Sequence, residues 1–222
     1  MGKINKLNLT DLKKSFEVLD KFQTSRLKGK AYYFSTYDGS FLGKSGNSDE
    51  IRFMSSETFN HNQLYGIVTD TAGVSFCDAS ESTQVDFLRR HIDTSYGGNI
   101  EKGYGQAMGW KTANGQFTSF LYNPIDGVFS NYNDFKNTMV HENHHYTNNH
   151  TTRTPENEIS AITAMVNDSS YANTSGDHKY TTTDYLFQQW KLQNVAGTPG
   201  HTWADACRIC KYTGGGQPPA GY

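Results

Sequence analysis

Residues 141–145 read His-Glu-Asn-His-His. On a helix, positions i and i+4 lie one turn apart on the same face, so the side chains of His141 and His145 point the same way, about 6 Å apart. Two imidazoles at that separation suit one tetrahedral Zn²⁺. Glu142 lies beside them, where its carboxylate can reach a water in the open fourth position and accept its proton. The pentapeptide therefore predicts a zinc site with a base next to it.

Chance rarely produces this pattern in a chain of this composition. The 222 residues include eight His and eight Glu, and a shuffled sequence would contain about 0.01 matches. Four of the eight His lie within residues 141–150, so a His-rich polar helix face without a metal is the alternative interpretation. The sequence that follows favours the metal, because it supplies a third ligand.

We expect that third ligand to be Glu158, 13 residues after His145 on the next helix. Glu156 lies on nearly the opposite side of the same helix, so only one of the two carboxylates can face the metal. Ile159 and Ile162 place Glu158 beside the buried face of that helix. Glu156 is then a solvated residue of the first turn, where a negative charge interacts favourably with the helix dipole.

His150 is the competing third ligand. It would complete the pattern HExxHxxxxH, which is one residue shorter than HExxHxxGxxH and lacks the glycine that turns the chain back. His144 lies next to the ligand stripe, where a surface role or a hydrogen bond in the cleft is expected.

Local patterns place the motif in an α+β fold. Apolar spacing predicts the helices, while Asp38-Gly39 and Asn114-Gly115 between strand-prone runs predict tight hairpin turns. The expected helices are 10–22, 81–93, 133–148, one beginning at Thr154-Pro155, and 183–195; the expected strands are 31–37, 40–43, 51–54, 106–112 and 116–122. These elements predict a small N-terminal helix-plus-hairpin module, 1–57, and a second domain, 58–222.

The motif His141-Glu142-xx-His145 with Asn157-Glu158-Ile159-Ser160-Ala161 resembles the gluzincins, zincin metallopeptidases whose third ligand is a glutamate. The resemblance implies a small antiparallel sheet with a backing helix, 81–93, then the active-site helix and the glutamate helix. It also implies that strand 116–122 borders the cleft and pairs with extended substrate. Thermolysin-like gluzincins carry an acid four residues after the glutamate, where this chain has Ile162, so the outer partners of the histidines are unassigned.

This resemblance implies a zinc metalloendopeptidase that cuts peptide bonds with an activated water and Glu142 as general base. The oxyanion needs a further donor, usually a downstream Tyr or His. His178 and Tyr180, expected in the loop after the glutamate helix, are the candidate catalytic residues. Three other downstream residues are runners-up for that role: Tyr171, Tyr185 and His201.

A second, shorter likeness concerns Tyr37–Gly43 with Gly46 and Asp49–Arg52. The segment resembles one that precedes toxin domains in bacterial polymorphic-toxin and Rhs-like proteins, some of which end in zincin peptidases. It implies a toxin or effector that is made in the cytoplasm and exported by a specialised injection system, with an immunity protein and a delivery apparatus as partners. The N-terminus lacks the apolar core of a Sec signal, which agrees with that route.

Composition narrows the function classes further. The formal charge of −2 gives no electrostatic footprint for nucleic acid, and there is no run of 18 apolar residues to span a membrane. The mean hydropathy of −0.70 is low, but 14% aromatic residues predict a core of aromatic rings. Cys207 and Cys210 in CxxC spacing are interpreted as ordinary thiols, with a local disulfide as the alternative.

Two further functions compete with a protein-cleaving zinc peptidase. The first is a zinc hydrolase of peptidoglycan crosslinks from a phage or secretion system, which would use the same site. The second is a non-catalytic zinc-binding module. Glu142 argues against the second, because a structural site needs no base and closes its fourth position.

Overall fold

A computed structural model describes residues 31–45, 48–66, 72–103, 108–193 and 201–214. Over these residues the chain is a mixed α+β structure with two small sheets and six α-helices. The strands are β1 (Ala31–Ser35), β2 (Phe41–Ser45), β3 (Ile51–Met54), β4 (Val74–Ser75), β5 (Asn99–Lys102), β6 (Met108–Ala113) and β7 (Gln116–Tyr122). The α-helices are α2 (Ser56–Leu64), α3 (Glu81–Arg89), α4 (Tyr132–Thr147), α5 (Pro155–Asn167), α6 (Gly176–Gln193) and α7 (Trp203–Ile209), and the 3-10 helices are η1 (Gly127–Ser130) and η2 (Ser169–Asn173).

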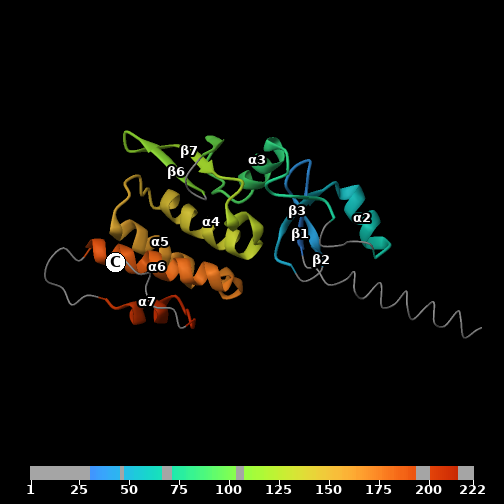
Figure 1. Ribbon diagram of the computed structural model, residues 1–222. Coiled ribbons are helices and arrows are strands. Elements are labelled where there is room, and N and C mark those ends of the chain that lie inside the picture. Colours follow the sequence, from blue (N-terminus) through green and yellow to red (C-terminus); the bar gives the residue numbers. More distant parts are fainter. Residues whose placement is uncertain (1–30, 46–47, 67–71, 104–107, 194–200, 215–222) are drawn as a thin grey trace, which may run out of the picture.

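The elements lie in layers around α4. Figure 1 shows β6 and β7 over one side of α4, with α5, α6 and α7 following in turn on the other side. The N-terminal strands and α2 lie at one end of the molecule, away from α5, α6 and α7. None of the helices in the described ranges is long and apolar enough to cross a lipid bilayer.

The N-terminal sheet has the order β2-β1-β3-β4. Its β1–β2 hairpin confirms the Asp38-Gly39 turn, where Gly39 has a φ of +68°. A Cβ on Gly39 would lie 2.6 Å from the backbone nitrogen of Phe87, so the turn needs glycine to pack against α3. The expected strand 51–54 is confirmed as β3, which runs parallel to β1. The expected helix 10–22 lies outside the described residues.

The second sheet has the order β5-β7-β6. Asn114 (φ 53°) and Gly115 (φ 72°) form the turn between antiparallel β6 and β7, which confirms the predicted hairpin. The expectation of an antiparallel sheet was wrong, because β5 pairs with β7 in parallel and β1 pairs with β3 in parallel. The hairpin reverses the chain, so β7 returns in the direction of β5 and completes a mixed sheet.

The main core is aromatic, as the composition predicts. Its fully buried rings come from both sheets, the turn after β4, α3 and α4: Phe34, Phe53, Phe76, Phe87, Phe120, Tyr122 and Phe135. This cluster contains residues on both sides of position 57, and the proposed division into 1–57 and 58–222 stays a prediction. A second cluster, with Ile162, Leu186 and Trp190, joins α5, α6 and α7.

The helices after the second sheet begin close to their predicted positions, with one exception. Residues 133–148 and the helix beginning at Thr154-Pro155 correspond to α4 and α5. Helix α6 begins at Gly176, well before the expected residue 183. The Ser175 hydroxyl accepts a hydrogen bond from the His178 backbone nitrogen at 3.0 Å, and Asp134 accepts from the Ser175 backbone nitrogen at 2.8 Å. This long-range anchoring of Ser175 begins the helix early, so His178 and Tyr180 are helical residues.

Candidate metal centre

Helix α4 supplies two of the candidate ligands. Asn131 caps its N-terminus by accepting hydrogen bonds from two backbone nitrogens of the first turn. Phe135 and Met139 are buried in the aromatic core. His141 and His145 are only 8% exposed and lie one turn apart, as the i, i+4 spacing predicts.

Helix α5 supplies the third candidate ligand, Glu158. Thr154 caps it, and Pro155 occupies its first turn, where the missing N–H costs no hydrogen bond. Glu158 is buried, whereas Glu156 is exposed, so the buried face of α5 selects Glu158 as the sequence predicts. The hydroxyl of Ser160 on α5 lies 2.8 Å from Nε2 of His144 on α4 and ties the two helices together beside the site.

His141, His145 and Glu158 form a buried group that could bind a metal ion. Nε2 of His141 lies 3.1 Å from Nε2 of His145, and Oε2 of Glu158 lies 3.3 Å and 3.5 Å from these two nitrogens. Ligands at 2.0–2.2 Å from one tetrahedral ion stand about 3.3–3.6 Å apart. The three atoms therefore form a triangle of the size that one such ion would cap.

The chemistry of these atoms also favours a cation. Burial lowers the pKa of His141, although the carboxylate of Glu158 raises it in part. Burial alone would raise the pKa of Glu158, but hydrogen bonds from His141 and His145 outweigh it and hold the pKa far below its usual range. Two imidazole nitrogens and an ionised carboxylate thus converge on one point in a buried site, where a bound cation would take the place of the imidazole protons.

Glu142 lies beside this group and is itself 9% exposed. Burial, followed by repulsion from Glu158, raises the pKa of the Glu142 carboxyl to about 8. Its backbone carbonyl accepts a hydrogen bond of 2.6 Å from the indole nitrogen of Trp110 on β6, which fixes α4 against the sheet. A bound cation would counter the repulsion and favour the ionised form that can accept a proton.

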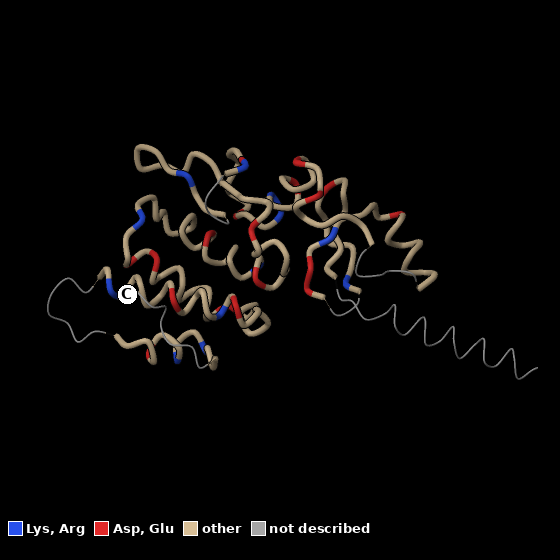
Figure 2. Tube along the Cα trace, in the orientation of Figure 1, with Lys and Arg blue, Asp and Glu red and all other residues tan. Residues whose placement is uncertain are grey.

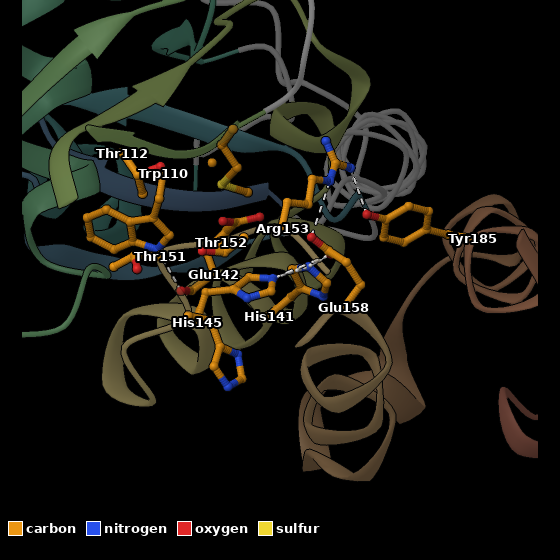
Figure 3. Close-up of a pocket in the computed structure, with 13 residues that line it drawn as sticks. Trp110, Thr112, His141, Glu142, His145, Thr151, Thr152, Arg153, Glu158 and Tyr185 are labelled. Carbon is orange, nitrogen blue, oxygen red and sulfur yellow. Dashed lines mark hydrogen bonds and ion pairs between the residues drawn. The ribbon is translucent and has the colours of Figure 1, made fainter. Parts of the chain in front are cut away.

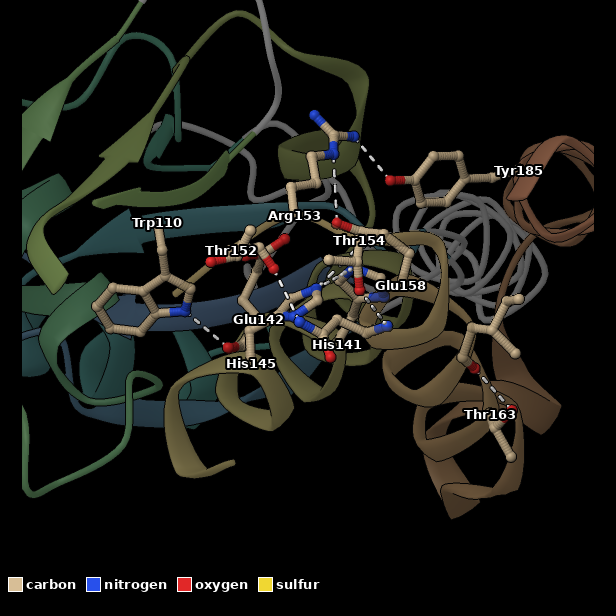
Figure 4. A network of polar contacts seen from close by, with 12 residues as sticks. Trp110, His141, Glu142, His145, Thr152, Arg153, Thr154, Glu158, Thr163 and Tyr185 are labelled. Atoms are coloured by element: carbon tan, nitrogen blue, oxygen red, sulfur yellow. Dashed lines mark hydrogen bonds and ion pairs between the residues drawn. The ribbon is translucent and has the colours of Figure 1, made fainter. Parts of the chain in front are cut away.

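Arg153 and Tyr185 complete one side of the site, as Figures 3 and 4 show. Nε of Arg153 lies 3.2 Å from Oε1 of Glu158, which leaves Oε2 for the two imidazoles. Nη2 of Arg153 donates a hydrogen bond of 2.7 Å to the Tyr185 hydroxyl. The sequence reasoning overlooked Arg153, although its place five residues before Glu158 in the α4–α5 connection was a usable signal.

A cavity of about 240 Å³ opens at this group. One wall belongs to β6, from which Met108, Gly109, Trp110 and Thr112 line the cavity. The expectation that strand 116–122 borders the cleft was wrong: that strand is β7, which is hydrogen-bonded to β5 on one side and to β6 on the other. β6 forms the edge of the described sheet, so it is the strand that can receive an extended chain.

The structure separates the two predicted catalytic residues. His178 lines a second cavity together with His141 and Glu142. The ring of Tyr180 packs against Trp203 and Tyr212, and Tyr180 lines neither of these two cavities. Tyr185, a runner-up in the sequence, lines both of them.

The other candidates lie elsewhere or at the margin of the site. Tyr171 donates a hydrogen bond to the carbonyl of Cys210 at 2.8 Å, and His201 stacks on Trp190. His150 lines the first cavity, with its ring 5.6 Å from that of His145, but it is not one of the three grouped ligands. Cys207 and Cys210 are free thiols, as interpreted from their spacing.

Comparison with known proteins adds no relative to this description. No protein-family model, curated protein or solved structure matches the chain. A function for this protein is therefore inferred from the residues and the geometry of the site.

Proposed function

We propose that the protein is a zinc-dependent metallopeptidase that hydrolyses peptide bonds. The observation that carries this proposal is the triangle of His141, His145 and Glu158 with Glu142 buried beside it. Two histidines and one glutamate are a ligand set of catalytic zinc sites, which keep their fourth position open. A carboxylate adjacent to the ligands but outside the triangle is what a hydrolase needs as a base.

The chemistry that a bound Zn²⁺ supplies is Lewis acidity toward water and toward a substrate carbonyl. Glu142 accepts the proton of the attacking water and later delivers it to the nitrogen of the leaving amine. Burial, the larger cause, raises the pKa of Tyr185 to about 12, so its hydroxyl keeps its proton. That oxygen accepts from Arg153, and its hydrogen faces the Glu158 carboxylate. Turned toward a substrate oxyanion, the same hydrogen can be donated to it, which makes Tyr185 the best-placed donor.

The edge of β6 supports a peptide as the substrate. Peptides commonly add as a strand to a free sheet edge, where backbone hydrogen bonds hold them independently of sequence. Trp110 on this strand lines the cavity and contacts α4 through the Glu142 carbonyl. An extended chain along β6 would therefore pass directly by Glu142. A toxin role, an injection system and an immunity partner stay predictions.

Metal analysis tests the proposal directly. Purified protein is expected to hold about one zinc per chain, and zinc at 100 times its Kd is expected to stabilise the fold by about 2.7 kcal/mol. For a chain of 222 residues this corresponds to a rise of about 5–10 °C in melting temperature. The measurement is elemental analysis with thermal unfolding in chelator and in zinc. Iron as the bound metal, or no thermal shift with zinc, would contradict the proposal.

Replacing Arg153 by Met is expected to weaken zinc binding by about 10–100-fold, the usual effect of removing a group that orients a ligand. The guanidinium holds Oε1 of Glu158, and without it the carboxylate can rotate away from the histidines. Competition with a fluorescent zinc chelator measures the change. Arg153→Lys, which keeps the charge, is expected to recover part of the affinity. Equal zinc affinity of Arg153→Met and the unaltered protein would remove this role.

A further inference from the structure

A second cavity, of about 690 Å³, adjoins the candidate metal centre. It shares His141, Glu142 and Tyr185 with the first cavity, so the two are neighbouring parts of one cleft. Its size lies within the range of about 300–1,000 Å³ that is typical of ligand sites. A substrate held against Glu142 can therefore extend into it.

Carboxylates give this second cavity its charge. Asp126 at the start of η1, Asp134 in the first turn of α4 and Asp177 in the first turn of α6 all line it (acidic positions are red in Figure 2). Neither Lys nor Arg is among its lining residues. Within the described ranges, none of the three carboxylates forms an ion pair with a basic side chain. Ser175 donates to both oxygens of Asp134, so Asp126 and Asp177 are the carboxylates that remain open to a ligand.

His178 adds an acceptor and no positive charge. The side-chain nitrogen of Asn137 donates to the Met165 carbonyl at 2.9 Å and to the Ser170 hydroxyl at 3.0 Å, which leaves its Oδ1 facing Nε2 of His178 at 3.0 Å. Nε2 of His178 must therefore be the donor in that contact. Burial lowers the pKa of His178, so Nδ1 carries a lone pair.

The first cavity differs in charge, because Arg153 lines it and pairs with Glu158 there. Apart from Glu142 and the metal group, the carboxylates that line the cleft lie in the second cavity. Val128 and Met165 add apolar wall to the second cavity, against which the methylene stem of a long basic side chain can pack.

We propose that the second cavity binds a Lys or Arg side chain of the peptide substrate, close to the bond that is cut. The inference rests on the proposed peptidase function, because it takes Glu142 as the centre of the cleft. Asp126 and Asp177 are its specificity-determining residues, since both line the cavity and neither belongs to the metal group.

Affinity selection tests this without relying on turnover. A random library of capped decapeptides is passed over immobilised, zinc-loaded Glu142→Gln protein, and the bound peptides are sequenced. We expect enrichment of Lys and Arg at one position, falling by up to about fivefold for each of Asp126→Asn and Asp177→Asn. Asn keeps the size of the side chain and can still accept the hydrogen bond that caps η1. Glu156→Gln, an exposed charge outside both cavities, is the matched control and is expected to leave the enrichment unchanged.

The same library incubated with zinc-loaded unaltered protein separates the two proposals. If the protein cleaves the library but the bound peptides show no preference for Lys or Arg, the proposed role of the second cavity is overturned and the proposed peptidase function is not. Enrichment of Lys and Arg that persists in a variant carrying both Asp126→Asn and Asp177→Asn would also overturn the role of the second cavity. No cleavage of the library, of folded proteins or of peptidoglycan would instead overturn the proposed function.

Discussion

Glu142→Gln is expected to lower kcat for peptide hydrolysis by about 10²–10⁴-fold while one zinc per chain is retained. The amide has nearly the size of the carboxylate, but it cannot accept a proton from the attacking water. It also removes the repulsion between Glu142 and Glu158 that raises the pKa of the Glu142 carboxyl. The three ligands remain, although a negative charge near the cation is lost, so the variant should bind zinc within a few-fold of the unaltered protein while the chemical step suffers most.

The measurement combines metal analysis with hydrolysis of two substrate classes, a proteome-derived peptide mixture and purified sacculi. Glu156→Gln, which removes an exposed carboxylate from the first turn of α5, is the matched control and should keep full activity. Preferential digestion of sacculi would favour the peptidoglycan alternative over a protein substrate. An unchanged rate in Glu142→Gln would remove Glu142 from the mechanism.

Glu158→Ala is expected to abolish zinc binding at micromolar zinc and, with it, both the thermal shift and the activity. The substitution removes one of the three candidate ligands and leaves two imidazoles 3.1 Å apart without the carboxylate that completes the triangle. The loss should exceed the roughly 10–100-fold that follows removal of an orienting group such as Arg153. Titration with zinc, followed by calorimetry or chelator competition, measures it.

His150→Ala is the companion variant, because His150 is the competing ligand and lines the same cavity. We expect it to bind zinc within a few-fold of the unaltered protein. If instead His150→Ala lost the metal and Glu158→Ala kept it, the ligand set would have to be His141, His145 and His150, and the site would not be of the glutamate type. Circular dichroism of each zinc-free variant shows that a loss of metal is not a loss of fold.

The pentapeptide determined the two candidate ligands on α4 because helix geometry is local: residues four apart share a face wherever the helix lies. The same locality predicted both hairpin turns, since Asp38-Gly39 and Asn114-Gly115 satisfy the backbone angles that such turns require. The choice of Glu158 over Glu156 as the buried carboxylate followed from the apolar face of α5, which is again a property of one helix.

Long-range contacts decided what local patterns left open. The parallel pairing of β5 with β7 places β6 at the sheet edge beside the cavity, and pairing between strands cannot be deduced from either strand alone. The anchoring of Ser175 by Asp134, 41 residues earlier, moves the start of α6 and carries His178 into the second cavity.

The sequence by itself therefore determined the candidate metal group of this protein: two histidines, a glutamate and an adjacent carboxylate on two helices. Only the tertiary structure decided the surroundings of that group: Arg153 against Glu158, Tyr185 rather than Tyr180 in the lining of both cavities, and three aspartates around the second cavity. The physical reason is the distance along the chain over which each interaction acts. Ligand spacing is set by the turn of one helix, whereas the partners of a ligand come from segments that meet only when α4, α5 and α6 pack together.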